Sequence, residues 1–368
     1  MKFKSIKILD QGLMVTFNNS ESDCYPFIWL RDHAQDETSW DSRSNQRKIF
    51  TADIDPLISV DKVNLADDKD KIYIRWPDLT FDVEYTCDFL FNNMQDSIKK
   101  EKIKKINWDR ITINNYDIDL DFSSLKDRKG IQKLLNNLLK FGFCVLNLCP
   151  AEMESVEYIT NKIGYVRNSI FGGLWSFESN SNMADSAYTQ EELRPHTDGT
   201  YNHDAPGLQL LLCCEYDAKG GESIMVDGLK LAEIIKKTDK ESYSSLTTVE
   251  VPGAYIGDGV YLEAKRPIFK INHEKEITQV SFNNYDRSIF RLPNDETNKF
   301  YKANRTFDKL ANNRDLQWRQ ILKPGQLLIF DNWRILHGRG EFKGTRKMSG
   351  CYINREDFES SCRMHNIN

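Results

Sequence analysis

From residue 207 onward, the chain is a succession of short apolar segments separated by turn-forming residues. The segment 208–214 is almost continuously apolar, as expected of a strand that is covered on both faces. The same reading predicts further strands at 222–227, 268–272, 277–282, 327–331 and 347–353. Such segments bury their apolar residues by packing strand against strand. We therefore expect an all-β core that is either closed or built as a sandwich.

Apolar residues at helical spacing predict helices that pack outside this core. Ile131, Leu134, Leu135 and Leu138 recur at the helical period, and they follow residues that can cap a helix. The predicted helices span about 123–140, 152–163, 228–237 and 294–313. The expected fold class is therefore mainly β with flanking helices.

The length of the chain indicates more than one domain. Its 368 residues suggest one large domain and a smaller one. Residues 1 to about 90 are rich in predicted β structure, with alternating strands at 12–17 and 71–76. The segment 91–120 is charged, rich in Asn and only weakly periodic, so we place a boundary near residue 100. This division gives a small β-rich N-terminal domain, 1–100, and a larger domain, 101–368.

Composition excludes several classes of function. The net charge of −5 provides no general surface for polyanions. The one dense basic run, 99–105, lacks the interleaved aromatic residues that would stack on bases. No apolar run approaches the roughly 20 residues of a membrane span, and the N-terminus lacks a signal-peptide pattern. The eight cysteines show no paired spacing and are expected to be free thiols. We expect a cytoplasmic protein that binds neither nucleic acid nor membrane.

One stretch within the β-rich region carries a candidate metal site. His196 and Asp198 are two residues apart, and in an extended strand they would project from the same face. The pair alone also occurs by chance in solvated loops, and a metal site needs a third ligand. His337 is the best candidate, because it follows an apolar strand and precedes a Gly-Arg turn. Two His and one carboxylate with open positions form the facial triad of non-haem Fe(II) oxygenases.

Other residues near these motifs are weaker candidates on spacing alone. Arg346 lies nine residues after His337, and a hairpin between them would place its guanidinium where it could bind a carboxylate. An ordinary salt bridge at a strand end would explain Arg346 equally well. His203 follows the metal pair on a predicted turn and could face a substrate. Aromatic residues are dense around the motifs. Core packing is their default explanation, although clustered Trp and Tyr faces are also what a quaternary ammonium ligand requires.

Five motifs recur along the chain in a familiar order. They are Trp29-Leu30-Arg31-Asp32, His196-Thr197-Asp198, Gly220-Gly221-Glu222-Ser223, Phe282-Asn283-Asn284-Tyr285-Asp286-Arg287 and Asp331-Asn332-Trp333-Arg334-Ile335-Leu336-His337-Gly338-Arg339. Together they resemble the γ-butyrobetaine hydroxylase and trimethyllysine dioxygenase family of Fe(II)- and 2-oxoglutarate-dependent oxygenases. The resemblance covers most of 120–365 and extends to the small N-terminal domain. It implies a catalytic core that is a double-stranded β-helix, or jelly roll.

The resemblance also implies which residues bind the cofactors. His196, Asp198 and His337 would bind Fe(II). Arg346 would hold the distal carboxylate of 2-oxoglutarate, and Leu211 would line the same pocket. O₂ would be the second co-substrate, and ascorbate is the expected reductant that maintains activity.

Further residues match substrate-binding positions of the family. The aromatic cage for a trimethylammonium group would consist of Phe171, Trp175, Tyr188 and Tyr352, with Phe171 standing where Tyr is common. Asn284 matches a position that contacts the substrate. We expect the anionic end of the substrate to be bound by Tyr201, Asn202 and His203, in the loop 199–204, and by Arg287.

The implied reaction is hydroxylation of an unactivated CH₂ of a small trimethylammonium compound, with release of succinate and CO₂. Trimethyllysine, γ-butyrobetaine and 2-trimethylaminoethylphosphonate all remain open as substrates. The alternative is an oxygenase of the same fold that acts on another amino acid or a sulfonate. The family resemblance also suggests a homodimer.

The chain departs from the family at one point. Hydroxylases of γ-butyrobetaine often carry a Cys-rich zinc site directly after the Trp-Leu-Arg-Asp motif, completed by a later His. Here residues 33–38 contain no Cys, and Thr80 stands at the later position. We therefore predict no structural zinc, which argues modestly against γ-butyrobetaine as the substrate.

Overall fold

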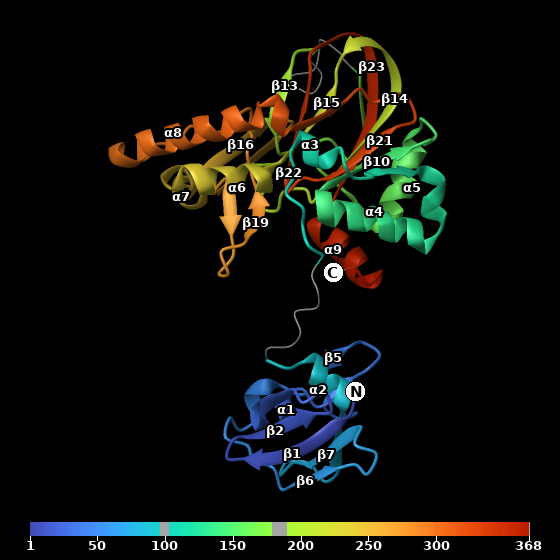
Figure 1. Ribbon diagram of the computed structural model, residues 1–368, viewed down its shortest axis with the longest axis vertical. Helices are drawn as coiled ribbons and strands as arrows, with labels where there is room; N and C mark the ends of the chain where they lie inside the picture. The colour runs from blue at the N-terminus through green and yellow to red at the C-terminus, as the bar shows by residue number, and fades with distance from the viewer. Residues whose placement is uncertain (96–102, 179–189, 368) are drawn as a thin grey trace. The chain divides into compact units, whose positions relative to one another are not determined.

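The computed structural model describes residues 1–95, 103–178 and 190–367. The chain divides into two compact units, Met1–Lys102 and Ile103–Asn368 (Figure 1). None of the helices in the described ranges combines the length and the apolar character that crossing a bilayer requires.

The N-terminal unit is built around two three-stranded antiparallel sheets. The first consists of β1 (Phe3–Leu9), β2 (Gly12–Phe17) and β3 (Ser22–Pro26). The second consists of β6 (Lys62–Leu65), β7 (Lys71–Arg75) and β8 (Asp82–Thr86). The remaining elements are α1 (Phe27–Asp32), the ribbon β4 (Trp40–Asp41) with β5 (Gln46–Arg47), a 3-10 turn at Thr51–Asp53, and α2 (Cys87–Asn92). The strands expected at 12–17 and 71–76 are confirmed.

The Trp-Leu-Arg-Asp motif forms α1, and its arginine ties this helix to the second sheet. Arg31 is buried and forms an ion pair with Asp78, with 2.8 Å between Nη2 and Oδ2. The hydroxyl of Tyr85 donates a hydrogen bond to the carbonyl of Leu30 at 2.8 Å. The motif therefore has a structural role in this unit.

The larger unit contains two sheets that together form the jelly-roll core. The larger sheet has the order β11-β23-β14-β21-β10-β9, with β12 paired to β23, and the smaller has the order β13-β22-β15-β20. The first comprises β9 (Asp119–Asp121), β10 (Phe143–Asn147), β11 (Val166–Arg167), β12 (Trp175–Glu178), β14 (Leu208–Gly220), β21 (Leu327–Asp331) and β23 (Phe342–Ile353). The second comprises β13 (Leu193–His196), β15 (Ser223–Asp227), β20 (Gln317–Gln320) and β22 (Ile335–Arg339). The mainly β fold predicted from the sequence is confirmed.

Helices cover the outer faces of this core (Figure 1). The first group consists of α4 (Arg128–Phe141), α5 (Met153–Ile163) and α9 (Arg355–Met364), which share a hydrophobic cluster with the larger sheet. The second group consists of α6 (Gly228–Thr238), α7 (Lys240–Thr248) and α8 (Asn294–Ala311), which pack with residues of the smaller sheet. The short α3 (Arg110–Ile113) and a 3-10 turn at Arg314–Leu316 lie between longer elements.

The apolar residues at the start of β14 do not alternate with polar ones, and two hydrophobic clusters explain why. Leu208, Leu210 and Leu212 belong to the cluster under α4 and α5, whereas Leu211 and Cys213 belong to the cluster between the two sheets. Both faces of this strand are therefore buried. The strand is longer than expected, since it continues to Gly220.

Several boundaries differ from the sequence expectation. The helix expected at 123–140 begins only at Arg128, because Asp127 is extended and residues Phe122–Lys126 form a separate 3-10 turn. The strands at 269–271 and 277–280 form the hairpin β18 (Phe269–Ile271) and β19 (Ile277–Val280). The hairpin of β16 (Val251–Gly257) and β17 (Val260–Arg266) was not predicted, and neither was α7.

A buried ion pair fixes the segment that leads into β22. Nη2 of Arg334 lies 2.8 Å from Oδ2 of Asp227, and both side chains are almost fully buried. Arg334 also donates to the carbonyls of Ile106 and Lys140, while Asp227 accepts the backbone N–H of Trp108. The pair thus connects the end of β15, the end of α4 and the start of the larger unit.

We expect Arg334→Met to lower the free energy of unfolding by about 3–5 kcal/mol, because the carboxylate of Asp227 would stay buried without its cation. Urea unfolding followed by tryptophan fluorescence measures this loss. The control is Arg110→Met, which breaks the exposed pair with Asp315 at 2.9 Å and should cost less than about 1 kcal/mol. Equal losses in the two variants would contradict a special role for the buried pair.

Candidate metal centre and adjoining pocket

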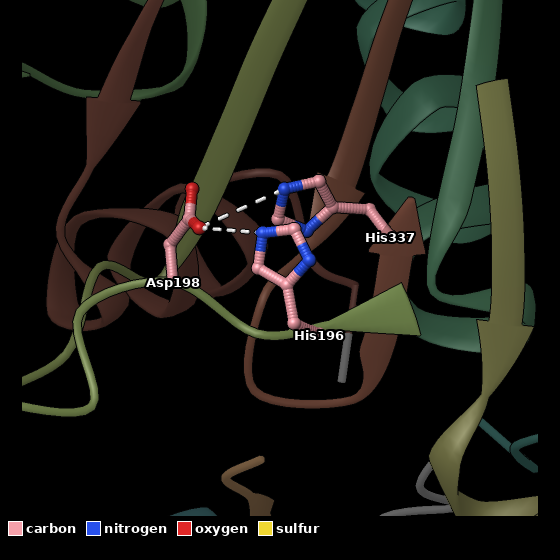
Figure 2. Close-up of side chains that lie close together, drawn as sticks. All are labelled: His196, Asp198 and His337. Atoms are coloured by element: carbon pink, nitrogen blue, oxygen red, sulfur yellow. Dashed lines mark ion pairs between the residues drawn. The ribbon is translucent and has the colours of Figure 1, made fainter. Parts of the chain in front are cut away.

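Three side chains with metal-binding groups converge on one edge of the smaller sheet. His196 in β13 is directly opposite His337 in β22, because the two strands pair in antiparallel register. Strand β13 ends at His196, and Asp198 lies in the bend that follows. The expectation that an extended strand presents both residues on one face is therefore wrong. The bend brings the carboxylate to the two imidazoles (Figure 2).

The three groups point toward one another. Oδ1 of Asp198 lies 3.4 Å from Nε2 of His196 and 3.7 Å from Nε2 of His337 (Figure 2). Their ligand atoms all lie within 4.8 Å of one another, and no other group of this kind occurs among residues 1–95, 103–178 and 190–367. Two imidazole nitrogens and one carboxylate oxygen are a donor set that suits Fe(II). The residues present therefore fit such an ion.

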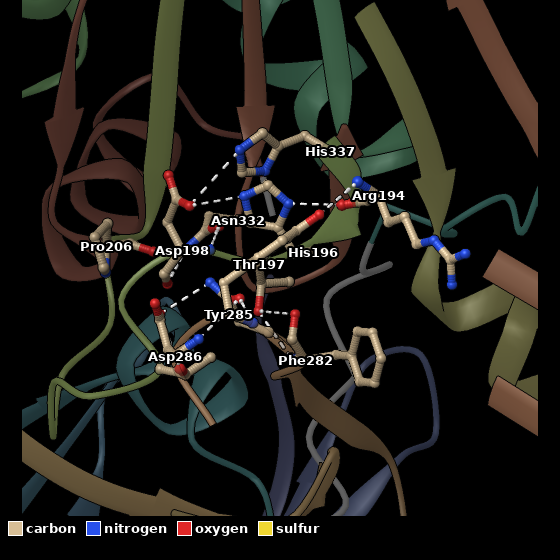
Figure 3. A network of polar contacts seen from close by, with 12 residues as sticks. Arg194, His196, Thr197, Asp198, Pro206, Phe282, Tyr285, Asp286, Asn332 and His337 are labelled. Carbon is tan, nitrogen blue, oxygen red and sulfur yellow. Dashed lines mark hydrogen bonds and ion pairs between the residues drawn. The ribbon is translucent and has the colours of Figure 1, made fainter. Parts of the chain in front are cut away.

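Hydrogen bonds hold the bend that carries Asp198 (Figure 3). The backbone N–H of Asp198 donates to Oδ1 of Asn332 at 2.8 Å, and Nδ2 of Asn332 donates to the carbonyl of Asp198 at 3.0 Å. The backbone N–H of Thr197 donates to the carbonyl of Phe282 at 2.7 Å. The hydroxyl of Tyr352 donates to Oδ2 of Asp198 at 2.8 Å, which leaves Oδ1 facing the imidazoles. Asn332 is thus a positioning residue that sequence reasoning did not identify.

The charge states of the three groups favour metal binding. Burial alone would raise the pKa of Asp198, but His337, His196 and the Tyr352 hydroxyl hold that pKa well below its usual range. Burial lowers the pKa of His337 to about 4, so its ring is neutral at pH 7. Burial is the largest single influence on the pKa of His196 and acts to lower it. The hydrogen bond and the negative charge of Asp198, together with the carbonyl of Arg194, outweigh burial, and the pKa is raised. Nδ1 of His196 contacts the carbonyl of Arg194 at 2.8 Å, which leaves Nε2 to face the metal position.

A pocket between the two sheets opens onto the three ligands, and Arg346 and Leu211 line it. Arg346 is buried in β23, and no described carboxylate forms an ion pair with it. The expected hairpin between His337 and Arg346 is wrong, because β22 and β23 belong to different sheets. Arg346 instead reaches the pocket from the sheet that faces the metal ligands.

Aromatic residues form one wall of the same pocket. Phe171, Trp175 and Tyr352 line it together with Phe177. The ring centroids of Trp175 and Tyr352 are 5.7 Å apart, and the ring of Trp175 stacks on that of Phe177 at 5.2 Å. Tyr188, which completes the expected aromatic cage, lies outside the described residues.

The residues expected to bind the anionic end of the substrate do not gather here. Of these, only Tyr201 lines the pocket. Asn202 and His203 do not line it, and Arg266 donates to the carbonyls of both. Asn284 and Arg287 line a smaller separate hollow.

The sequence did not identify several other pocket residues, including Asn283, Asp286, Tyr255 and Arg339. Arg339 could have been found, since it lies two residues after His337 and therefore on the same face of the strand. Asn283 is one residue from the expected Asn284. Tyr255 belongs to a hairpin that the sequence did not predict, so no sequence signal marked it.

Comparison with known proteins agrees with this geometry. The model of the taurine catabolism dioxygenase TauD, TfdA family matches residues 110–352, and the model of the gamma-butyrobetaine hydroxylase-like N-terminal region matches residues 5–91. The fold and the family define a 2-oxoglutarate-dependent dioxygenase, an enzyme that uses Fe(II), 2-oxoglutarate and O₂. The chain belongs to the TauD/TfdA family, within the group of trimethyllysine and γ-butyrobetaine dioxygenases.

Individual relatives cover nearly the whole chain. A trimethyllysine dioxygenase from Meyerozyma guilliermondii is 32% identical, over 100% of this chain and 97% of the relative. A gamma-butyrobetaine dioxygenase from Pongo abelii is 26% identical, over 96% and 94% of the two chains. The crystal structure of a taurine dioxygenase from Burkholderia xenovorans has a TM-score of 0.50 at 13% identity, over 68% of this chain and 89% of that one, and this likeness shows the shared fold alone.

Proposed function

We propose that this enzyme hydroxylates a CH₂ group of trimethyllysine, with conversion of 2-oxoglutarate to succinate and CO₂. The observation that carries the proposal is a single pocket that holds both the three metal-binding groups and a wall of aromatic rings. The greater identity to the trimethyllysine relative than to the γ-butyrobetaine relative supports trimethyllysine among the three compounds considered.

In this proposal His196, Asp198 and His337 hold Fe(II). The bound ion, with 2-oxoglutarate and O₂, supplies the oxidising chemistry that hydroxylates the substrate. Arg346 pairs with the distal carboxylate of 2-oxoglutarate, which would give this buried guanidinium the anionic partner that the described residues do not provide. Leu211 supplies an apolar wall for the carbon chain of the co-substrate.

The aromatic wall is proposed to bind the trimethylammonium group. A quaternary ammonium has no N–H to donate, so it is bound by ring faces rather than by hydrogen bonds. Phe171, Trp175 and Tyr352 offer such faces on one side of the pocket, and Tyr188 is proposed to complete the set. The hydroxyl of Tyr352 is engaged by Asp198, so its ring stays beside the metal position.

We expect Trp175→Ala to raise the KM for trimethyllysine by about 10- to 30-fold, which corresponds to the roughly 2 kcal/mol of a desolvated cation–π contact. Steady-state kinetics with mass-spectrometric detection of product measures this change. The matched control is Trp175→Phe, which keeps a ring face and should recover most of the loss. An unchanged KM in Trp175→Ala would exclude this residue from the cage.

A substrate panel tests the proposed function. Purified enzyme with Fe(II), ascorbate and 2-oxoglutarate is incubated with trimethyllysine, γ-butyrobetaine, 2-trimethylaminoethylphosphonate, lysine and taurine. We expect a gain of one oxygen on trimethyllysine and none on lysine, which lacks the quaternary ammonium. Conversion of taurine or lysine alone would favour the alternative, an oxygenase for another amino acid or a sulfonate.

We further propose the domain division and the oligomeric state that the sequence suggests. The two compact units support a small N-terminal domain, 1–100, and a catalytic domain, 101–368. A homodimer is proposed, and light scattering at several protein concentrations tests it. The absence of a nucleic-acid partner, the absence of structural zinc and the cytoplasmic location stay predictions. Most of the basic run 99–105 lies outside the described residues.

A further inference from the structure

We propose that Asp286 binds the α-ammonium group of the substrate and thereby selects a trimethylated amino acid over compounds whose far end is only anionic. This inference rests on the proposed function, because it concerns how trimethyllysine is recognised in the same pocket. It replaces the sequence expectation that the far end of the substrate is read as an anion by the loop 199–204 and Arg287.

The pocket contains one acidic side chain beyond the metal site. Of the described residues that line it, two are acidic, Asp198 and Asp286. Asp198 faces the two imidazoles and the hydroxyl of Tyr352. Asp286 belongs to a segment that follows β19, and it lines the same pocket as His196. Asp286 therefore shares the pocket with the metal ligands without being part of the ligand set.

Neighbouring groups fix the position of the Asp286 carboxylate. Oδ2 accepts a hydrogen bond from Oγ1 of Thr200 at 3.1 Å and another from Nδ2 of Asn283 at 2.9 Å. The carbonyl of Asp286 accepts the backbone N–H of Ala254 at 2.9 Å, which ties this segment to β16. These two donors are a hydroxyl and an amide, and both are neutral. A positioned, half-buried anion on a ligand pocket suits a cationic group of the ligand.

The charged residues of the pocket favour one candidate substrate over the other two. Arg346 is buried on the pocket and can receive an anionic group. The aromatic wall is suited to the trimethylammonium group, which all three compounds share. Only trimethyllysine carries a second cation, whereas γ-butyrobetaine and the phosphonate carry an anion alone at the far end. Asp286 would attract the α-ammonium group of trimethyllysine and repel the anionic ends of γ-butyrobetaine and the phosphonate.

The position of Asp286 also bears on which carbon of the substrate faces the metal. An ammonium bound by Asp286 would lie in the pocket that also contains the metal ligands, and the adjacent carbons of the substrate would extend toward the metal position. The aromatic wall would hold the other end of the molecule. Two charged ends fixed at separate points leave little freedom in which carbon faces the metal.

The experiment compares trimethyllysine with 6-(trimethylammonio)hexanoate, the same chain without the α-amino group. The wild-type enzyme should prefer trimethyllysine in kcat/KM by about 10- to 100-fold, the range that a hydrogen bond to a charged group provides. Asp286→Asn should lose about the same factor on trimethyllysine, mainly through KM, and change by less than about threefold on the hexanoate. The KM for 2-oxoglutarate should stay constant. The control Glu274→Gln removes an exposed acid from a surface turn and should alter neither substrate.

The outcomes separate the two claims. A wild-type enzyme that hydroxylates neither compound overturns the proposed function, and this inference with it. If the wild type converts trimethyllysine but Asp286→Asn keeps its full preference, the inference alone is overturned. Equal losses on both compounds also overturn it, because Asp286 would then serve the trimethylammonium group or the fold rather than the α-ammonium.

Discussion

Asp198→Ala is expected to reduce Fe(II)-dependent turnover of 2-oxoglutarate by at least about 10³-fold, well beyond the roughly 10- to 100-fold loss that follows from removing a residue outside the ligand set. Asp198 supplies the one anionic ligand of the proposed site, and its Oδ1 atom lies within 3.7 Å of both imidazole nitrogens. Without it, two neutral imidazoles remain at pH 7, and they are a poorer site for a divalent ion.

Succinate formation measured against Fe(II) concentration checks this prediction, and calorimetric titration with a redox-stable divalent metal reports binding directly. The control is His273→Ala, which removes an exposed imidazole that lies outside the pocket and should leave both measurements unchanged. Metal affinity that survives in Asp198→Ala would show that the ion binds elsewhere.

Arg346→Leu is expected to raise the KM for 2-oxoglutarate by about 100-fold or more, because the distal carboxylate would enter a buried pocket without its cationic partner. Arg346 is buried on the wall opposite the metal ligands, and burial lowers its pKa from that of an exposed guanidinium. Arg346→Lys should have a KM for 2-oxoglutarate between those of the wild type and Arg346→Leu, because an ammonium provides charge without the paired N–H geometry.

The stability of the same variant separates a binding role from a structural one. Arg346 is buried and has no ion pair among the described residues, so its removal should not destabilise the folded enzyme in the absence of 2-oxoglutarate. Thermal unfolding should then show that 2-oxoglutarate stabilises the wild type but not Arg346→Leu. A large loss of stability without the co-substrate would indicate that Arg346 mainly supports the fold.

The sequence identified the metal-binding side chains but not the way they meet. His196, Asp198 and His337 were marked by residue type and by their position near strand ends. The bend at Asp198 depends on Asn332 and Phe282, which are distant in sequence, so local spacing could not reveal it. Arg346 was also predicted as a site residue, but from an expected hairpin that does not exist. Between His337 and Arg346 the chain passes from one sheet to the other. This change of sheet depends on the closed core and not on the local sequence of that segment.

The substrate end of the pocket was harder to predict for a physical reason. Asn202 and His203 follow the metal pair closely in sequence, but Arg266 binds their carbonyls and neither residue lines the pocket. Asp286 and Tyr285 enter from a segment that pairs with the unpredicted hairpin at 251–266. A motif such as Phe282–Arg287 indicates that a segment matters, whereas which of its side chains faces the pocket is decided by its tertiary neighbours.

The central claim is that this chain couples oxidation of 2-oxoglutarate to hydroxylation of trimethyllysine. A reaction under ¹⁸O₂ tests it most directly, with mass spectrometry of both products. We expect one labelled oxygen in hydroxylated trimethyllysine and one in succinate, formed in equal amounts and only with Fe(II) present. Labelled succinate without labelled trimethyllysine, at saturating concentrations of the amino acid, would contradict the account.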